Sequence, residues 1–166
     1  TLDNLRGLSI EKIFIPSKAN MNGVSLLPYK IVRPNQFCFV TITSRNSDKI
    51  TLALNTSEED YIVSSSYITF EIDDIDVLDP HFLLLCFKRP EFDRYARFHS
   101  LGSARESFDY QDMCKVRIPL PPIDVQRAIV NIYHCAEEAK RIAEEADRLS
   151  REICPALMQH IIHEAD

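Results

Sequence analysis

The chain divides at the stretch Ile118-Pro119-Leu120-Pro121-Pro122-Ile123-Asp124-Val125-Gln126-Arg127-Ala128-Ile129-Val130. Three prolines within four residues lack the backbone N–H that a strand ladder or a helix interior needs. The pattern before this stretch mixes strands with short helices, and the pattern after it is helical. We therefore predict one domain over residues 1–120 and a separate helical segment over residues 121–166.

The part before the prolines has the alternation and the aromatic or β-branched enrichment of strands. The expected strands are residues 29–32, 36–43, 50–54, 61–63, 67–72 and 115–120. Two short helices are expected at 81–88, after the capping pair Asp79-Pro80, and at 91–99, after Pro90. Gly102 is the expected stop of the second helix, whose apolar positions are Phe92, Tyr95, Ala96 and Phe98. The fold class is mixed α/β (α+β), with a twisted, mostly β domain.

Residues 124–162 are expected to form one long helix with a heptad seam. Its apolar or small residues lie alternately three and four positions apart: Ile129, Ile132, Ala136, Ala139, Ala143, Ala146, Ser150, Ile153 and Leu157. This spacing is typical of a coiled coil, and the small residues in its middle allow close approach but bury little area. Such a helix is weak alone, so we predict that it pairs with a second helix. The alternative is a helix folded back onto its own domain.

The bulk composition is that of an ordinary globular protein, with 166 residues, 45% of them hydrophobic and 27% charged. No apolar run reaches the roughly 18 residues of a membrane span, so no membrane partner is expected. The net charge of −6 does not by itself indicate nucleic-acid binding. Residues 1–120 carry 14 Lys and Arg against 16 Asp and Glu, so most of the excess acid belongs to the C-terminal segment. Since Thr1 is not an initiator Met, we expect the chain to be a piece of something longer.

The residues give no sign of an active site or a metal site. The five cysteines are widely spaced without a C-x-x-C pair, which argues against zinc and disulfides and favours a reducing cytoplasm and small buried thiols. Asp79-Pro80-His81-Phe82 distantly resembles the [DN]-P-P-[YF] motif of amino-methyltransferases, but a helix start explains it better. His160 and His163 lack an evident third metal ligand nearby.

Three polar loops are the better clue, at residues 16–20, 43–49 and 97–105. Lys and Arg suit phosphates and guanine edges, whereas Ser, Thr and Asn suit phosphate oxygens and base edges. For each loop taken alone, ordinary solvated chain is the better explanation. The predicted DNA-contacting residues are Lys18, Asn20, Arg45, Asn46, Lys49, Arg97, Ser103 and Arg105.

The proline-rich junction resembles the "iPlPPlxeQxxIv" signature of specificity subunits of Type I restriction-modification systems. Val125 stands where that family usually has Glu. Segments 4–9, 29–37, 62–67, 89–92 and 102–105 also resemble family segments in the same order. In this family, the junction separates a target recognition domain from a long conserved helix.

The resemblance implies a function in bacterial DNA modification and restriction. Each recognition domain of this family reads one half of a split double-stranded DNA site, and two antiparallel helices set the gap and dock modification (methyltransferase) subunits. The chain would be a specificity subunit or half-subunit, completed covalently or as a homodimer, and linked through the modification subunits to a restriction subunit. It would catalyse nothing and hold no cofactor, because S-adenosylmethionine, ATP and Mg²⁺ belong to partner subunits. The alternatives are a non-catalytic scaffold that does not read DNA and a stand-alone enzyme.

Overall fold

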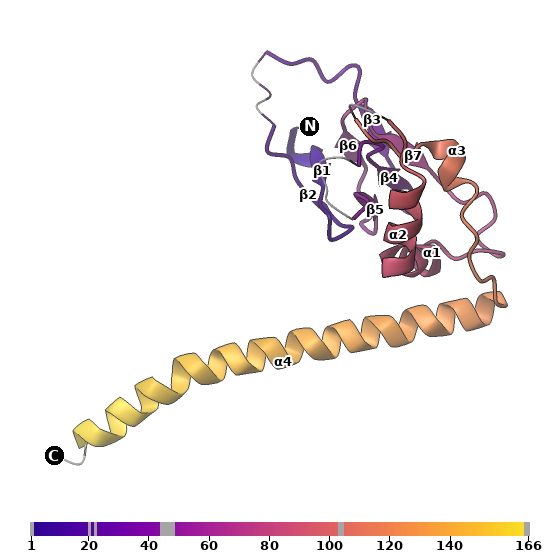
Figure 1. The fold of residues 1–166 in the computed structure, drawn as a ribbon. Coiled ribbons are helices and arrows are strands. Elements are labelled where there is room, and N and C mark those ends of the chain that lie inside the picture. Colours follow the sequence, from indigo (N-terminus) through magenta and orange to yellow (C-terminus); the bar gives the residue numbers. More distant parts are fainter. Residues whose placement is uncertain (1, 20, 22, 44–48, 103–104, 165–166) are drawn as a thin grey trace. The chain divides into compact units, whose positions relative to one another are not determined.

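The computed structural model describes residues 2–19, 21, 23–43, 49–102 and 105–164, but not the side chains at positions 2 and 156–164. Its contacts divide the chain into two units, Thr1–Gln126 and Arg127–Asp166. In the described part of the first unit, small antiparallel sheets combine with three short α-helices (Figure 1). No helix in the described ranges is both long and apolar enough to cross a membrane. The expected mixed α+β class is confirmed.

Among the described residues, the named strands form three small sheets, and each pairing between these strands is antiparallel. In two of them a single pair is present: β1 (Arg6–Leu8) with β2 (Phe14–Pro16), and β3 (Lys30–Val32) with β6 (Tyr61–Val63). In the third, β4 (Phe37–Phe39) lies between β5 (Leu52–Leu54) and β7 (Ile68–Phe70).

Strand β4 is buried on both faces because its alternating side chains enter two different clusters. Phe37 and Phe39 join the main core, which the helices cover, and the Phe37 ring stacks on Phe70 with 4.9 Å between centroids. Cys38 points the other way, into a smaller cluster with Val32 and Val63. This strand therefore ties the β3–β6 pair to the helical side of the domain.

The short helices are α1 (Pro80–Lys88), α2 (Pro90–Phe98) and α3 (Tyr110–Met113). The Asp79 side chain accepts hydrogen bonds from the backbone N–H groups of His81 and Phe82, so Asp79 is the N-cap of α1. The cap confirms that Asp79-Pro80 is a helix start. The presence of α1 and α2 confirms both expected helices. Helix α3 was not predicted from the sequence, although Asp109 caps it in the same way.

The long helix α4 runs from Ile123 to Glu164, which confirms the expected helix. Its first turn is anchored by Gln126, which is fully buried. The Gln126 amide donates to the carbonyls of Val77 (2.9 Å) and Pro121 (2.8 Å) and accepts from the Asp79 N–H (3.0 Å). The glutamine of the junction signature therefore hydrogen-bonds the start of α4 to the segment that leads into α1.

Some details of the expected secondary structure are wrong. The strand predicted at 115–120 is absent: none of these residues, all described, belongs to a strand, and Lys115 still lies in the turn that follows α3. Pro119 also lacks the N–H that a strand ladder needs. Val116 and Ile118 still pack against the core from this segment. Helix α2 ends at Phe98, so Gly102 is not its stop. Strand β6 has its predicted bounds, whereas β3, β4, β5 and β7 are shorter than the apolar runs that predicted them.

The expectation of buried thiols holds for only one of the cysteines in full. Cys38 is buried and Cys86 is half-buried, whereas Cys114, Cys135 and Cys154 are exposed. Burial raises the pKa of the Cys38 thiol to about 12, an effect that Lys30 partly offsets. All five are free thiols in the structure.

Candidate nucleic-acid interface

The turn between β1 and β2 is fixed to helix α2 by a buried ion pair. Lys12 adopts a positive φ of 59°, and its ammonium lies 2.7 Å from Oδ1 and 2.9 Å from Oδ2 of Asp93. The Asp93 Oδ1 atom also accepts the Ile50 N–H at 3.0 Å. One carboxylate therefore joins the β1–β2 turn, the chain just before β5, and α2.

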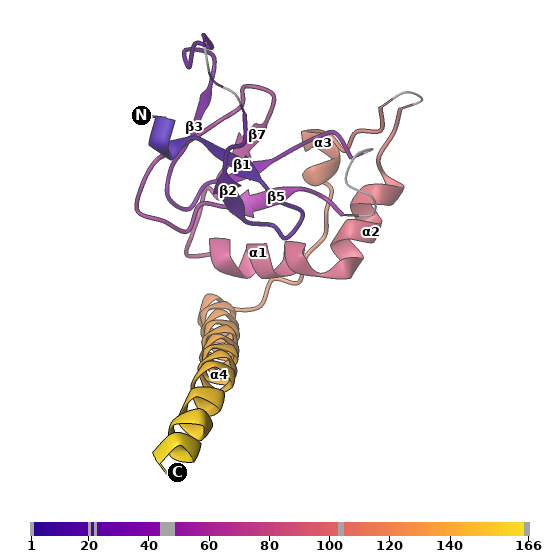
Figure 2. The same ribbon diagram turned by 90° about the vertical axis from the view of Figure 1, so that its left-hand side faces the viewer.

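The chain that follows α2 doubles back onto the end of the β4 segment. Leu101 and Ser107 pair through two backbone hydrogen bonds, and Ser107 also forms a bridge with Ile42. Thr43 donates its N–H to the Glu106 carbonyl (2.9 Å), and Phe108 donates to Thr41 (2.9 Å). The flanks of two predicted DNA-contacting loops, 43–49 and 97–105, thus lie side by side (Figure 2).

Gly102 shapes the tip of the second loop. Its φ is +136°, and a Cβ at this position would lie 2.2 Å from the carbonyl oxygen of Arg105. No side chain larger than hydrogen fits there without a backbone shift. The close approach of these two backbone segments fixes the backbone of Arg105, whose side chain is exposed.

Two of the predicted DNA-contacting cations are engaged in ion pairs at the surface. Lys49 Nζ lies 3.2 Å from Glu11 Oε1, and the guanidinium of Arg97 pairs with the Glu106 carboxylate. Both pairs are partly exposed, and such pairs contribute only about 0–1 kcal/mol to stability. A phosphate group can therefore compete for either cation at small cost.

The structure distributes the other predicted contacts unevenly. Lys18 is exposed and follows β2 at the end of the β1–β2 hairpin opposite the Lys12 turn, so nothing described joins it to the other two loops. Four predicted contacts lie outside the described residues: Asn20, Arg45, Asn46 and Ser103.

The residues that assemble this face were not predicted from the sequence. Lys12 and Asp93 are 81 positions apart, and no local pattern links them. Glu11 and Glu106 were likewise invisible as partners of Lys49 and Arg97. Phe98 was expected among the apolar positions of α2, yet it is 83% exposed and does not join the core.

Helix α4 carries a second apolar row beside the predicted seam. Cys135, Ile142 and Leu149 repeat every seven residues. They lie next to four residues of the predicted seam that repeat in the same way, Ile132, Ala139, Ala146 and Ile153. In this chain the large side chains of both rows are exposed, Ile132 by 70%. Ion pairs between residues three or four apart, such as Glu138–Arg141 and Glu145–Arg148, occupy other positions of the helix. The seam residue Leu157 lies in α4, but its side chain is outside the described residues.

These features define the class of the protein: a mixed α+β domain with a polar, loop-built face, continued through a proline-rich junction by a long helix with an apolar stripe. Residues 18–146 match the Type I restriction modification DNA specificity domain, and the chain belongs to this family. The match contains the junction, the predicted loops 43–49 and 97–105, and loop 16–20 only from Lys18 onward, but not segment 4–9. A comparison with curated proteins finds no match.

Proposed function

We propose that this chain reads one half of a split double-stranded DNA target, as the specificity subunit or half-subunit of a Type I restriction-modification enzyme. The proposal rests on two backbone hydrogen bonds, from Thr43 to Glu106 and from Phe108 to Thr41. They bring the flanks of two cation-bearing loops together in a chain of a DNA-specificity family.

The proposed face offers both kinds of DNA contact. Lys49 and Arg97 would leave their carboxylate partners and bind backbone phosphates instead. Such phosphate contacts fix the register of the domain on the duplex. Arg105, at the tip shaped by Gly102, is suited to bidentate contact with a guanine edge. Arg45, Asn46 and Ser103 extend these two loops, whereas Lys18 and Asn20 would contact DNA only through a separate segment.

The charge balance favours weak DNA binding by the chain alone. Residues 1–120 carry a net charge of −2, so few phosphates are neutralised and few counterions are released. Modification subunits would supply the remaining affinity, together with the S-adenosylmethionine chemistry. ATP and Mg²⁺ would act on a restriction subunit, and all would work in the cytoplasm.

The apolar stripe of α4 supports two contacts of the proposed assembly. The row of small residues, Ala136, Ala143 and Ser150, permits close antiparallel pairing with a second spacer helix, supplied covalently or by a second copy. The adjoining row of Cys135, Ile142 and Leu149 leaves an apolar flank for a modification subunit. A stripe of this width serves more than one neighbouring helix.

The DNA-reading part is tested by fluorescence anisotropy on the chain assembled with its modification subunits. The target is first mapped from the bases that the complex methylates, and a scrambled duplex serves as competitor. We expect Arg105→Ala to lose target preference and Arg33→Ala, an exposed arginine outside the proposed face, to retain it. If the complex without substitutions binds the target and the scrambled duplex with equal affinity, DNA reading is refuted and the scaffold function remains.

The helix-pairing part is tested by sedimentation velocity of the purified chain. Ala139→Glu places a charge in the seam, whereas His134→Glu places the same charge outside both apolar rows. We expect the chain without substitutions to self-associate. The Ala139→Glu variant should lose this association, and the His134→Glu variant should keep it. A monomeric unmodified chain, or an Ala139→Glu variant that still associates, contradicts pairing through this seam.

A further inference from the structure

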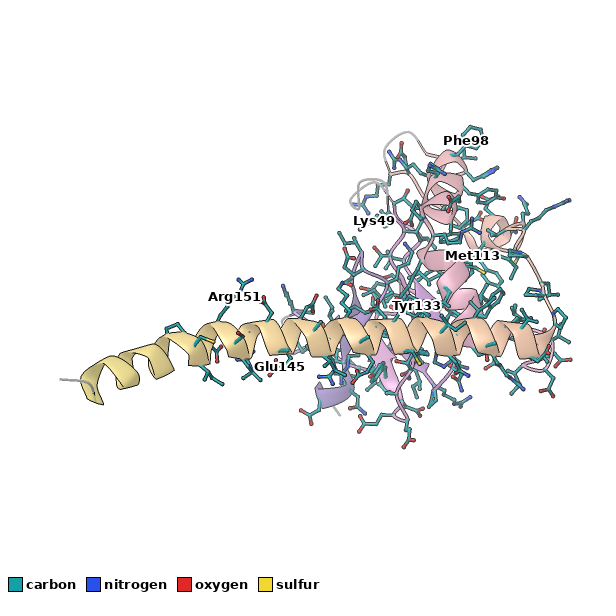
Figure 3. All side chains as sticks on the ribbon, turned by 90° about the horizontal axis from the view of Figure 1, so that it is seen from below. Lys49, Phe98, Met113, Tyr133, Glu145 and Arg151 are labelled. Carbon is teal, nitrogen blue, oxygen red and sulfur yellow. The ribbon has the colours of Figure 1, made fainter. Side chains whose placement is uncertain are left out.

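Two large apolar side chains are exposed at the end of α2 and just beyond it. Phe98 is 83% exposed and Leu101 is 73% exposed. Figure 3 shows the Phe98 ring projecting outward from the ribbon. Exposure of an aromatic ring to water is unfavourable, and clustered exposed apolar groups often mark a binding surface.

The Phe98 ring is supported from behind by a series of aromatic contacts that reaches the core. Buried Phe108 meets Tyr95 edge-on at 6.4 Å, Tyr95 lies 4.2 Å from the His99 ring, and His99 meets Phe98 at 5.2 Å, all between centroids. A side chain also caps the C-terminal end of α2, because Ser100 Oγ donates a hydrogen bond to the Ala96 carbonyl at 2.8 Å. A side chain held in this way loses little conformational entropy on binding.

Three arginines lie close to this apolar pair along the chain. Arg94 lies one helical turn before Phe98, Arg97 directly precedes it, and Arg105 follows Leu101 across the loop. The nearby carboxylates of Glu91 and Glu106 are already held in ion pairs with Arg94 and Arg97. An apolar pair near arginines whose exposed ion pairs a phosphate can displace is complementary to a polyanion that offers apolar groups between its charges, which describes a DNA groove.

We propose that Phe98 and Leu101 make an apolar contact with base edges of the bound DNA, so that part of the sequence reading is done by side chains without polar atoms. The inference rests on the proposed function and deepens it. The 5-methyl group of thymine is the apolar feature of the major groove. A contact of this kind adds affinity for a particular base without neutralising any phosphate.

The contact predicts a distinct salt signature. Phe98→Ala should weaken binding of the mapped target by about tenfold, equivalent to about 1.4 kcal/mol, with an unchanged slope of affinity against salt. A lost phosphate contact would instead reduce that slope by about one. Phe98→Leu should retain most of the affinity. Leu27→Ala removes a side chain that is 94% exposed in the segment between β2 and β3, and it should have no effect.

The experiment uses the chain assembled with its modification subunits, bound to the mapped target duplex, with p-benzoylphenylalanine replacing Phe98. Ultraviolet irradiation should yield a covalent protein–DNA adduct, and the affinity series above should hold. An adduct with a protein subunit, or full target preference in Phe98→Ala, overturns this inference alone. If the unmodified complex shows no target preference, the proposed function fails and this inference fails with it.

Discussion

The ammonium of Lys12 lies 2.7 Å from Oδ1 of Asp93, although the two residues are 81 positions apart in the chain. Both side chains are almost completely removed from solvent, and Asp93 Oδ1 also accepts the N–H of Ile50. The pair therefore fixes three segments that border the proposed DNA-binding face. Because both side chains are largely buried, we expect the pair to affect the proposed DNA-binding face only by positioning these segments.

Asp93→Ala is expected to destabilise the domain by about 3–5 kcal/mol, because it leaves the Lys12 charge buried without a partner. Urea denaturation followed by circular dichroism measures the loss. Lys115→Ala, which removes an exposed partner of Asp112, is the control and should cost at most about 1 kcal/mol. Similar losses in both variants would contradict a buried structural role for the Lys12–Asp93 pair.

Substitution at Gly102 tests the shape of the loop tip separately from stability. A Cβ there would meet the Arg105 carbonyl oxygen at 2.2 Å, so Gly102→Ala must displace the tip. We expect a clear loss of target preference in DNA-binding assays with little change in the thermal midpoint. Gly23→Ala is the matched control, since Gly23 also has a positive φ but has nothing within 4 Å of the added Cβ. Unchanged target preference in Gly102→Ala would show that the tip does not read DNA.

The sequence predicted the elements better than their arrangement. The capping pair Asp79-Pro80 and the heptad repeat of α4 are local signals, and each located a helix correctly. The β4 segment was also recognised, because aromatic and β-branched residues mark strands. The predicted strand at 115–120 failed because its apolar residues reflect packing against the core rather than pairing with a strand.

The candidate site was only partly predictable, for a physical reason. Residue type indicates which loops carry DNA-compatible groups, so the loops around Lys49 and Arg105 could be proposed. Their convergence depends on contacts between distant segments, such as Thr43 with Glu106, and these have no local signature. The exposure of Phe98 was equally hidden, because an aromatic residue in a helix usually marks its buried face.

Gln126→Leu is expected to destabilise the junction between the domain and α4. The substitution removes hydrogen bonds to the Asp79 N–H and to the carbonyls of Val77 and Pro121, each worth about 1–3 kcal/mol if its partner stays buried and unpaired. Urea denaturation should show the loss, whereas Gln111→Leu, at an exposed position of α3, should change stability little. Equal stability of the two variants would refute the anchoring role of Gln126.

Thiol reactivity should separate the cysteines by burial. The raised pKa of Cys38 leaves almost no thiolate at mildly alkaline pH, and the thiolate is the reactive form. Timed iodoacetamide labelling with peptide mass spectrometry should therefore modify Cys114 in the folded chain and Cys38 only after denaturation. Labelling of both at the same rate in the folded protein would contradict the burial of β4.

The central claim is that residues 1–120 choose the DNA sequence that the complex modifies. The most direct measurement replaces this segment with the recognition domain of another family member, keeps α4, and maps methylated bases by sequencing DNA modified by the complex. We expect the new complex to methylate a different sequence, changed in the half or halves that this domain reads. An unchanged methylation pattern from an active hybrid complex would contradict it.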